Sequence, residues 1–314
     1  MTSSTLPLVS IIIPLYNAEE TIAACLESCL GQTYANMEIV VVDDGSSDKS
    51  WDMVQEFSRQ YPAIHLYRQN RGGVTAARNH GMQQTSGEYV FFLDADDELP
   101  PRSLEFLMEK ARETNADITV GTALHMTTQG DVITKMNYLP FSLLSGEKWL
   151  KTIRQTWQGH LWGILLKKTL FSPVLHCPPS LKIGEDLLQV TQLAMRCDLV
   201  AMTEETVYYY IKRETSAINA RKIPSSIVNS DETLFIEAMQ YLQSKATSRK
   251  IKTECRLLAL FSALNLPPSD YRKKLIRHFR TSFLFHLLGD RHLIGQLWQI
   301  SPRLYAGILL ECIK

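Results

Sequence analysis

An apolar run that ends abruptly in carboxylates is the feature that most constrains this chain. Residues 89–93 are Tyr-Val-Phe-Phe-Leu, and Asp94, Asp96, Asp97 and Glu98 follow them directly. A short apolar run bounded by polar residues predicts a buried strand, and α/β proteins bind ligands at the carboxyl ends of such strands. A hard divalent cation such as Mg²⁺ or Mn²⁺ would offset the repulsion among these acids. The sequence therefore predicts a metal site at this strand end.

The same acids have two other interpretations. Their spacing matches part of a calcium-hand loop, but Leu99 occupies the position that requires glycine and Pro100-Pro101 stiffens the bend, which makes a calcium hand a poor fit. The acids could instead cap the next helix, whose apolar side includes Leu104 and Leu107. One acid is enough for a cap, so three acids in four positions favour a metal site, while capping stays open.

Two earlier segments repeat the order of strand, polar turn and helix. Residues 8–15 and residues 38–42 are apolar runs, and each is followed by a polar turn and an amphipathic stretch. The second strand ends in Asp43 and Asp44, and Asp48 is expected to cap the following helix. Capping leaves the first two acids unexplained at a strand's carboxyl end, so we expect one of them to contact a ligand.

A third short strand is predicted at residues 64–67, before a turn that leads into a helix of small residues. The turn contains Gly72-Gly73, whose backbone can approach a ligand closely, although the pattern is neither a dinucleotide-binding nor a P-loop motif. Arg78 follows on the first turns of the helix. Its guanidinium is expected either to pair with the acids at the strand ends or to meet a phosphate, and the sequence leaves both roles open.

Four stretches, in this order, resemble the family 2 glycosyltransferases of the GT-A fold. They are Val-Ser-Ile-Ile-Ile-Pro-Leu-Tyr-Asn (9–17), Val-Val-Asp-Asp-Gly-Ser-Ser-Asp (41–48), Gly-Gly-Val-Thr-Ala-Ala-Arg-Asn (72–79) and Gly-Glu-Tyr-Val-Phe-Phe-Leu-Asp-Ala-Asp-Asp (87–97). The resemblance is strong from residue 8 to about 120 and looser to about 220. It implies an α/β, Rossmann-like, doubly wound and mostly parallel sheet in a GT-A domain over residues 1–222, followed by a C-terminal helical region over residues 223–314.

The resemblance also implies a site for a nucleotide-sugar donor. Asp96 is implied as the direct ligand of Mn²⁺ or Mg²⁺, and Asp94 is implied to touch the ribose or the metal through water. Asp97 is a further neighbour. The implied contacts to the base are Pro14, Tyr16, Asp44 and, less directly, Glu19.

A second group of candidate residues lies between residues 157 and 216. The adjacent acids Glu185 and Asp186 begin a predicted helix and match the family's Glu-Asp motif, which implies that Asp186 is the base and that Glu185 faces away or contacts the acceptor. Arg213 would clamp the diphosphate or form a surface salt bridge. Trp162 would stack on a sugar or serve as ordinary core.

Composition and charge limit the setting in which the protein works. Hydrophobic residues make up 45% and charged residues 21% of the chain, and its six cysteines include no C-x-x-C pair, which favours a globular protein of the reducing cytoplasm. Residues 1–10 do not resemble a secretion leader, and no apolar run is long enough to span a bilayer. No nucleic-acid-binding motif is present.

The C-terminal part of the chain is basic. From Tyr241 onward thirteen Lys and Arg accompany four Asp and Glu, although the net charge of the whole chain is zero. Within the predicted helix 271–288, apolar residues recur every fourth position between basic ones, which is typical of an interfacial helix. We therefore expect an anionic membrane surface as a partner and a peripheral location on the cytoplasmic face of the inner membrane. The alternative is that the apolar side packs on the fold.

These features predict an inverting glycosyltransferase. The resemblance to the family implies that it moves a sugar, from UDP-hexose or UDP-N-acetylhexosamine, to a hydroxyl of a glycan or lipid-linked acceptor in polysaccharide or lipopolysaccharide synthesis. A sugar nucleotidyltransferase is the first alternative, but the glycine-rich loop expected after its first strand is replaced by Pro-Leu-Tyr-Asn at 14–17. A catalytically inactive membrane scaffold is the second alternative, although all the acids that the chemistry needs are present.

Overall fold

The computed structural model describes residues 6–136, 142–156, 158–213 and 225–265, with side chains omitted at 225–232 and 260–265. The chain divides into two units. The first comprises residues 1–146, 160–179 and 192–222, and the second comprises residues 147–159, 180–191 and 223–314. The basic amphipathic helix expected at 271–288 lies outside the described residues.

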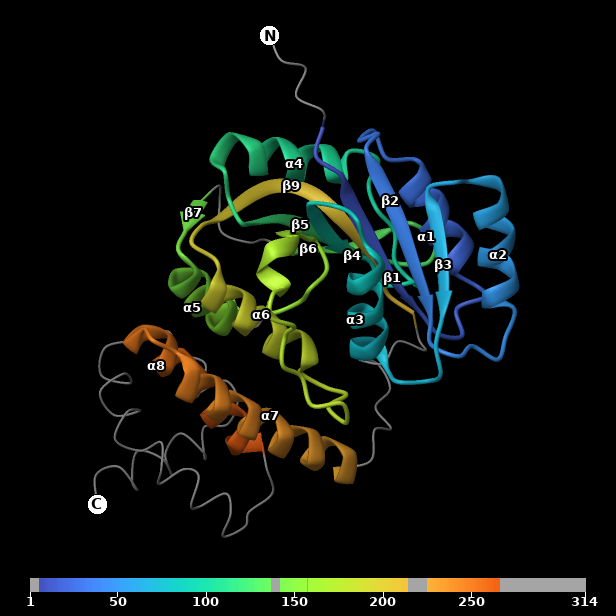
Figure 1. The fold of residues 1–314 in the computed structure, drawn as a ribbon. Helices are drawn as coiled ribbons and strands as arrows, with labels where there is room; N and C mark the ends of the chain where they lie inside the picture. The colour runs from blue at the N-terminus through green and yellow to red at the C-terminus, as the bar shows by residue number, and fades with distance from the viewer. Residues whose placement is uncertain (1–5, 137–141, 157, 214–224, 266–314) are drawn as a thin grey trace, which may run out of the picture. The chain divides into compact units, whose positions relative to one another are not determined.

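Within those residues, a nine-stranded sheet forms the centre of the first unit. Its order is β3-β2-β1-β4-β8-β5-β9-β7, and β6 also pairs with β5 (Figure 1). The first four strands in this order are mutually parallel, as the sequence predicted. Their bounds are β1 (Val9–Leu15), β2 (Met37–Asp43), β3 (Ile64–Arg68) and β4 (Tyr89–Phe92).

The sheet is mixed beyond β4, because β8 runs antiparallel to both of its neighbours, β4 and β5. The strand β9 is parallel to β5, whereas β6 and β7 are antiparallel to their partners. The bounds are β5 (Ile118–Met126), β6 (Val132–Met136), β7 (Ser142–Leu144), β8 (Ile164–Lys167) and β9 (Val200–Ile211). The α/β fold class is therefore confirmed, and the uninterrupted parallel arrangement is confined to β3, β2, β1 and β4.

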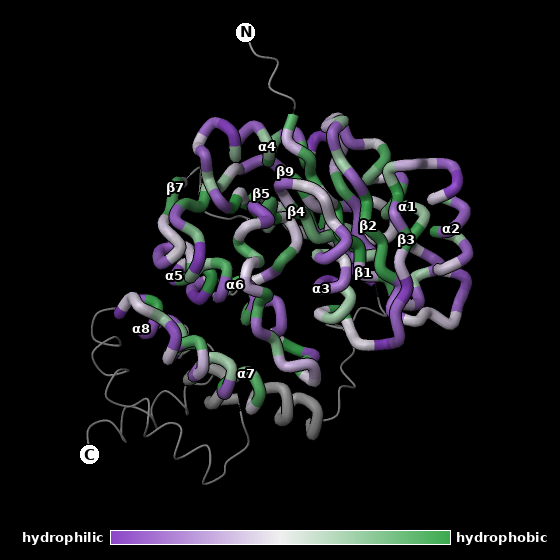
Figure 2. The backbone as a smooth tube through the Cα atoms, viewed as in Figure 1, coloured by the Kyte–Doolittle hydropathy of each residue, from purple (hydrophilic) through white to green (hydrophobic). Residues whose placement is uncertain are grey.

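Helices cover both faces of the parallel strands (Figure 1). On one face, Ile11 and Ile13 belong to the same core cluster as residues of α1 (Ile22–Leu30), α2 (Ser50–Gln60) and α4 (Ser103–Thr114). On the other face lies α3 (Val74–Gln84), where a Cβ added at Gly81 would be 2.6 Å from Ile12 Cγ2. Helix and sheet approach closely there because the residue has no side chain. Figure 2 shows the apolar colour along β1 and β2, between these two layers.

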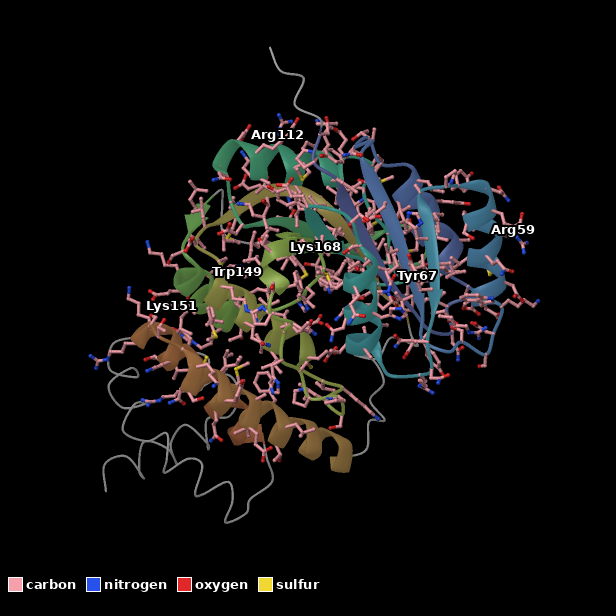
Figure 3. The ribbon with its side chains drawn as sticks, viewed as in Figure 1. Arg59, Tyr67, Arg112, Trp149, Lys151 and Lys168 are labelled. Carbon is pink, nitrogen blue, oxygen red and sulfur yellow. The ribbon has the colours of Figure 1, made fainter. Side chains whose placement is uncertain are left out.

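The second unit consists of helices and connecting segments. It contains α7 (Ser225–Lys245) and α8 (Arg249–Asn265), most of α5 (Gly146–Thr156) and the first half of α6 (Glu185–Arg196). Trp149 of α5 is buried and Lys151 is exposed (Figure 3). The buried Arg154 of α5 donates through Nε to Glu254 of α8 at 2.5 Å. This charged hydrogen bond joins two helices of the unit, and breaking such a buried pair costs roughly 3–5 kcal/mol.

A short connection after β8 returns the chain towards α3 in the first unit. It begins with the 3₁₀ helix η1 (Lys168–Phe171), and Lys168 (Figure 3) donates through Nζ to the carbonyl of Thr85 at 2.5 Å. Thr85 directly follows α3. No helix in the described residues is long and apolar enough to cross a membrane.

Candidate active site

The loop after β1 is joined to the turn after β2 by hydrogen bonds in both directions. The backbone N–H of Asn17 donates to Ser46 Oγ (3.0 Å), and Asn17 Oδ1 accepts from the backbone N–H of Ser47 (2.8 Å). Glu19 Oε2 accepts from the backbone N–H of Lys49 (2.9 Å), just before α2. The family resemblance implied that Glu19 lies near the base of a nucleotide. In the structure its carboxylate accepts the hydrogen bond from Lys49 and so links the two loops. These bonds fix two strand-end loops relative to each other.

Asp44 connects the end of β2 to the glycine turn before α3. Its side chain is buried and accepts from the backbone N–H groups of Gly72 and Gly73, each at 2.7 Å, and from Gln69 Nε2 at 2.8 Å. Gly73 has a φ of +87°, a conformation that glycine adopts without strain. A carboxylate has about four acceptor positions, and these three donors occupy three of them. Asp43 is also buried and forms an ion pair with an arginine of β3 at 2.9 Å.

A stacked pair of side chains stands beside a surface hollow at the ends of β1 and β3. The ring of Tyr16 is 37% exposed, and the guanidinium carbon of Arg71 lies 4.1 Å from its centroid. The adjacent hollow has a volume of about 710 Å³ and is lined by Gly45, Arg68, Gln69, Asn70 and Arg71. Exposed planar groups at such a place can stack on a heterocyclic base. Pro14 is in β1, paired in register with Val42.

Sequence reasoning did not select Arg71. Its position directly before Gly72-Gly73 was the available signal, because a cation next to a flexible turn is suited to an anionic or aromatic ligand. The sequence pattern alone gave no reason to bring it onto Tyr16, which is 55 positions earlier in the chain.

The first acid after β4 is paired with the arginine of α3. Arg78 donates through Nη2 to Asp94 Oδ1 at 3.0 Å, and its side chain is only 4% exposed. Of the two roles that the sequence left open for Arg78, this structure contains the pairing with an acid. The pair holds Asp94, whose side chain is 30% exposed, against α3.

The third acid, Asp97, is a buried structural residue. Its Oδ2 accepts from the hydroxyl of Tyr208 and its Oδ1 accepts from the backbone N–H of Ile211, both at 2.8 Å. Burial, together with the nearby charges of Asp94 and Asp96, raises the pKa of Asp97 well above its usual value. Its two oxygens face β9 and are occupied by protein donors.

Asp96 lies between these two engaged acids. In the part of the chain that the structure describes, its carboxylate takes part in no hydrogen bond or ion pair, while its backbone carbonyl accepts from Arg213 Nη2 at 3.1 Å. Among the described residues no group of three or more His, Cys, Asp or Glu could enclose a metal ion. Mg²⁺ is commonly held by one or two carboxylates together with substrate phosphates, so the Asp96 carboxylate fits a metal shared with a phosphate-bearing ligand.

Trp162 is a core residue in this structure. It is 5% exposed, and its ring stacks between His160, at a centroid distance of 4.4 Å, and Tyr208, at 4.7 Å. Both faces of the indole are therefore covered by protein rings. This geometry matches the core role among the two roles that the sequence left open.

Glu185 and Asp186 begin α6 and belong to the second unit. Both are half-buried. The preceding Gly184 has a φ of +88°, and a Cβ there would lie 3.1 Å from the ring of Phe235 in α7. The glycine therefore serves both the turn into the helix and its packing on α7.

Comparison with known proteins identifies the family. The profile of glycosyl transferase family 2 matches residues 10–184. The chain is 30% identical over 222 residues to the uncharacterized glycosyltransferase YibD of Escherichia coli, covering 66% of this chain and 62% of that protein. It is 32% identical over 217 residues to glycosyltransferase GlyA of Streptococcus pneumoniae, covering 66% of this chain but 31% of that protein. The chain thus spans less than two thirds of either relative, and it belongs to glycosyl transferase family 2.

Solved structures show the same fold. A Staphylococcus aureus TarS structure in complex with UDP-GlcNAc matches with a TM-score of 0.62 and 20% identity, over 92% of this chain and 79% of that one. A longer TarS structure matches with a TM-score of 0.58 and 19% identity, over 88% of this chain and 43% of that one. The fold predicted from the sequence, GT-A, is therefore confirmed.

Proposed function

We propose that this protein is an inverting glycosyltransferase acting in the synthesis of surface polysaccharide or lipopolysaccharide. Its donor would be UDP-hexose or UDP-N-acetylhexosamine, and its acceptor a hydroxyl of a glycan or lipid-linked molecule. The observation that carries the proposal is the available Asp96 carboxylate between two engaged acids, with Arg213 bound to the same residue. Family membership and the UDP-GlcNAc complex of TarS support this donor class.

The donor site would combine one metal and three kinds of protein contact. Asp96 would hold Mn²⁺ or Mg²⁺, which when bound neutralises charge on the diphosphate leaving group. Arg213 is fixed to the Asp96 carbonyl and would add a second positive charge there. Tyr16 and Arg71 would stack on the base, and Asp44 would accept a hydrogen bond from its edge.

The acceptor would be activated by Asp186. Its carboxylate would take the proton from the acceptor hydroxyl while that oxygen attacks the anomeric carbon and the bond from this carbon to the diphosphate oxygen breaks. One displacement of this kind inverts the configuration and forms no covalent enzyme intermediate. A positioned base contributes roughly 10²–10⁴-fold to such a step. Glu185 would contact the acceptor or face away from it.

A screen of nucleotide sugars tests the donor proposal. Thermal shifts measured with Mn²⁺ would identify the binding donor, and slow release of UDP from that donor would show that the protein is catalytically active. Release of pyrophosphate from a sugar phosphate and UTP would instead favour a nucleotidyltransferase. No shift with any nucleotide and no turnover would favour a non-catalytic scaffold.

A further inference from the structure

The last residues of β9 hold the loop that carries the acids. Tyr209 and Glu98 exchange backbone hydrogen bonds at 2.9 and 3.2 Å, and the backbone N–H of Ile211 donates to Asp97 Oδ1. Arg213 binds the carbonyl of Asp96. The strand thus contacts residues 97 and 98 of the loop, and Arg213, two residues beyond the end of β9, contacts residue 96.

The side chain of Tyr208 contacts both Asp94 and Asp97 in this loop. Its hydroxyl donates to Asp97 Oδ2 at 2.8 Å and accepts from the backbone N–H of Asp94 at 3.3 Å. The side chain is fully buried, and burial raises the pKa of Tyr208 well above its ordinary value, so its hydroxyl stays protonated at neutral pH and can donate. One hydroxyl therefore bridges the residues on either side of Asp96.

The ring of Tyr208 has little freedom to move. It stacks on Trp162 at 4.7 Å with an interplanar angle of 21°, and lies 6.4 Å from Phe91 of β4. Trp162 is itself held by a backbone β-bridge to Phe92 and by the stacked ring of His160. A side chain fixed in this way holds its hydroxyl at a constant position, which preorganises the groups bonded to it.

We infer that Tyr208 is a positioning residue, whose hydroxyl sets the acid loop so that the Asp96 carboxylate is presented for metal and diphosphate binding. The inference rests on the proposed function and deepens it. Asp96 cannot be held by its own carboxylate if that group is to bind a ligand, so its place must be set by its neighbours. Tyr208 acts on Asp94 and Asp97 without touching the ligand, which distinguishes its role from that of Asp96.

Tyr208→Phe tests the inference because it deletes only the hydroxyl and keeps the ring stack. The matched control is Tyr209→Phe, which deletes a hydroxyl from the next residue of β9, whose recorded contacts to the loop are made by its backbone. Amide hydrogen exchange over residues 93–99 is measured in the full-length proteins without ligand. We expect faster exchange in Tyr208→Phe, beginning with the N–H of Asp94, and wild-type exchange in the control.

The second readout is the Mn²⁺ concentration that gives half-maximal UDP binding in calorimetry. Losing a buried hydrogen bond should raise this concentration about fivefold or more in Tyr208→Phe, with UDP binding restored at saturating Mn²⁺. General damage to the fold would instead lower the fraction of protein that binds at any Mn²⁺ concentration.

Each other outcome overturns the inference in a recognisable way. Unchanged loop exchange in Tyr208→Phe would mean that the hydroxyl does not order the loop, whatever the protein binds. Faster exchange with an unchanged Mn²⁺ midpoint would mean that the hydroxyl orders the loop but does not position Asp96 for metal binding. A variant that does not fold would make the hydroxyl a folding requirement only. A wild-type protein that binds no UDP at any Mn²⁺ concentration would remove the proposed donor and the positioning role with it, even if exchange changed.

Discussion

The guanidinium carbon of Arg71 lies over the ring of Tyr16, 4.1 Å from the ring centroid. The two residues follow different strands, β1 and β3, and meet beside the hollow at the carboxyl ends of the sheet. Both are exposed and neither is needed to fill the core. A pair of this kind is suited to binding a flat ligand. The two side chains are already in contact before the ligand binds, so little conformational entropy is lost on binding.

We therefore predict that Tyr16→Ala weakens UDP binding by roughly tenfold, since stacking on a base contributes about 1–3 kcal/mol. Tyr16→Phe keeps the ring and should bind almost as well as the wild type. Calorimetry with UDP and Mn²⁺ measures both. Tyr61→Ala, at an exposed tyrosine that directly follows α2, is the control. Equal affinity in Tyr16→Ala and Tyr61→Ala would place the base elsewhere.

Asp186→Asn should separate donor binding from transfer. Asparagine keeps the shape of the side chain but cannot take the acceptor proton, so transfer should fall by roughly 10²–10⁴-fold while UDP affinity stays near that of the wild type. Product formation and calorimetry on the same preparation give the two quantities. Loss of UDP binding in the variant would instead make Asp186 part of the donor site.

His125 should make stability depend on pH in the weakly acidic range. Burial, with a smaller effect of the nearby Lys212 charge, lowers the pKa of His125 from 6.5. Below that pH the unfolded chain takes up a proton that the folded protein resists, so the free energy of unfolding falls as the pH drops from 6.5 towards the lower folded pKa.

His125→Phe keeps a ring against Tyr210 and removes this titration. The melting temperature of the wild type should fall more between pH 7.5 and pH 5 than that of the variant, and the two curves should run parallel above pH 7.5. Parallel curves over the whole range would show that His125 titrates normally in the folded state.

The sequence was most informative where the hydrophobic pattern and the chemistry coincide. The strands β1 to β4 and the acid loop could be predicted because buried parallel strands are continuous apolar runs that end in polar residues. The segment containing β8 was missed as a strand: Ile164–Lys167 is four residues long, and its pairing partners lie more than 35 positions away in the chain. Helix α5 was missed as well.

Within the site, the sequence singled out the acids of this loop but could not rank them by environment. Asp94, Asp96 and Asp97 are alike in sequence, and only the tertiary partners Arg78 and Tyr208 show which carboxylate stays available. The core role of Trp162 depends in the same way on rings from another strand. Because such partners are distant in sequence, a local sequence pattern cannot predict these contacts.

A further prediction concerns the basic C-terminal segment, which lies outside the described residues. If the segment at 271–288 is interfacial, the full-length protein should float with anionic liposomes at low salt and less so at high salt, because each Lys or Arg near such a surface contributes about 1 kcal/mol. A protein ending near Pro267 should remain in solution. Equal flotation of the two proteins, or none of either, would show that this segment does not bind the membrane.

UDP binding by wild type and Asp96→Ala, titrated in Mn²⁺ and in EDTA, tests whether Asp96 holds the metal that binds the donor. We predict that the wild type binds UDP in Mn²⁺ and loses most of its affinity in EDTA, because the metal would join Asp96 to the diphosphate. Asp96→Ala should bind weakly and equally in both, and should be inactive with the donor identified by the screen. Wild-type binding that is unaffected by EDTA, or an Asp96→Ala protein that keeps the full Mn²⁺ dependence, would contradict the account.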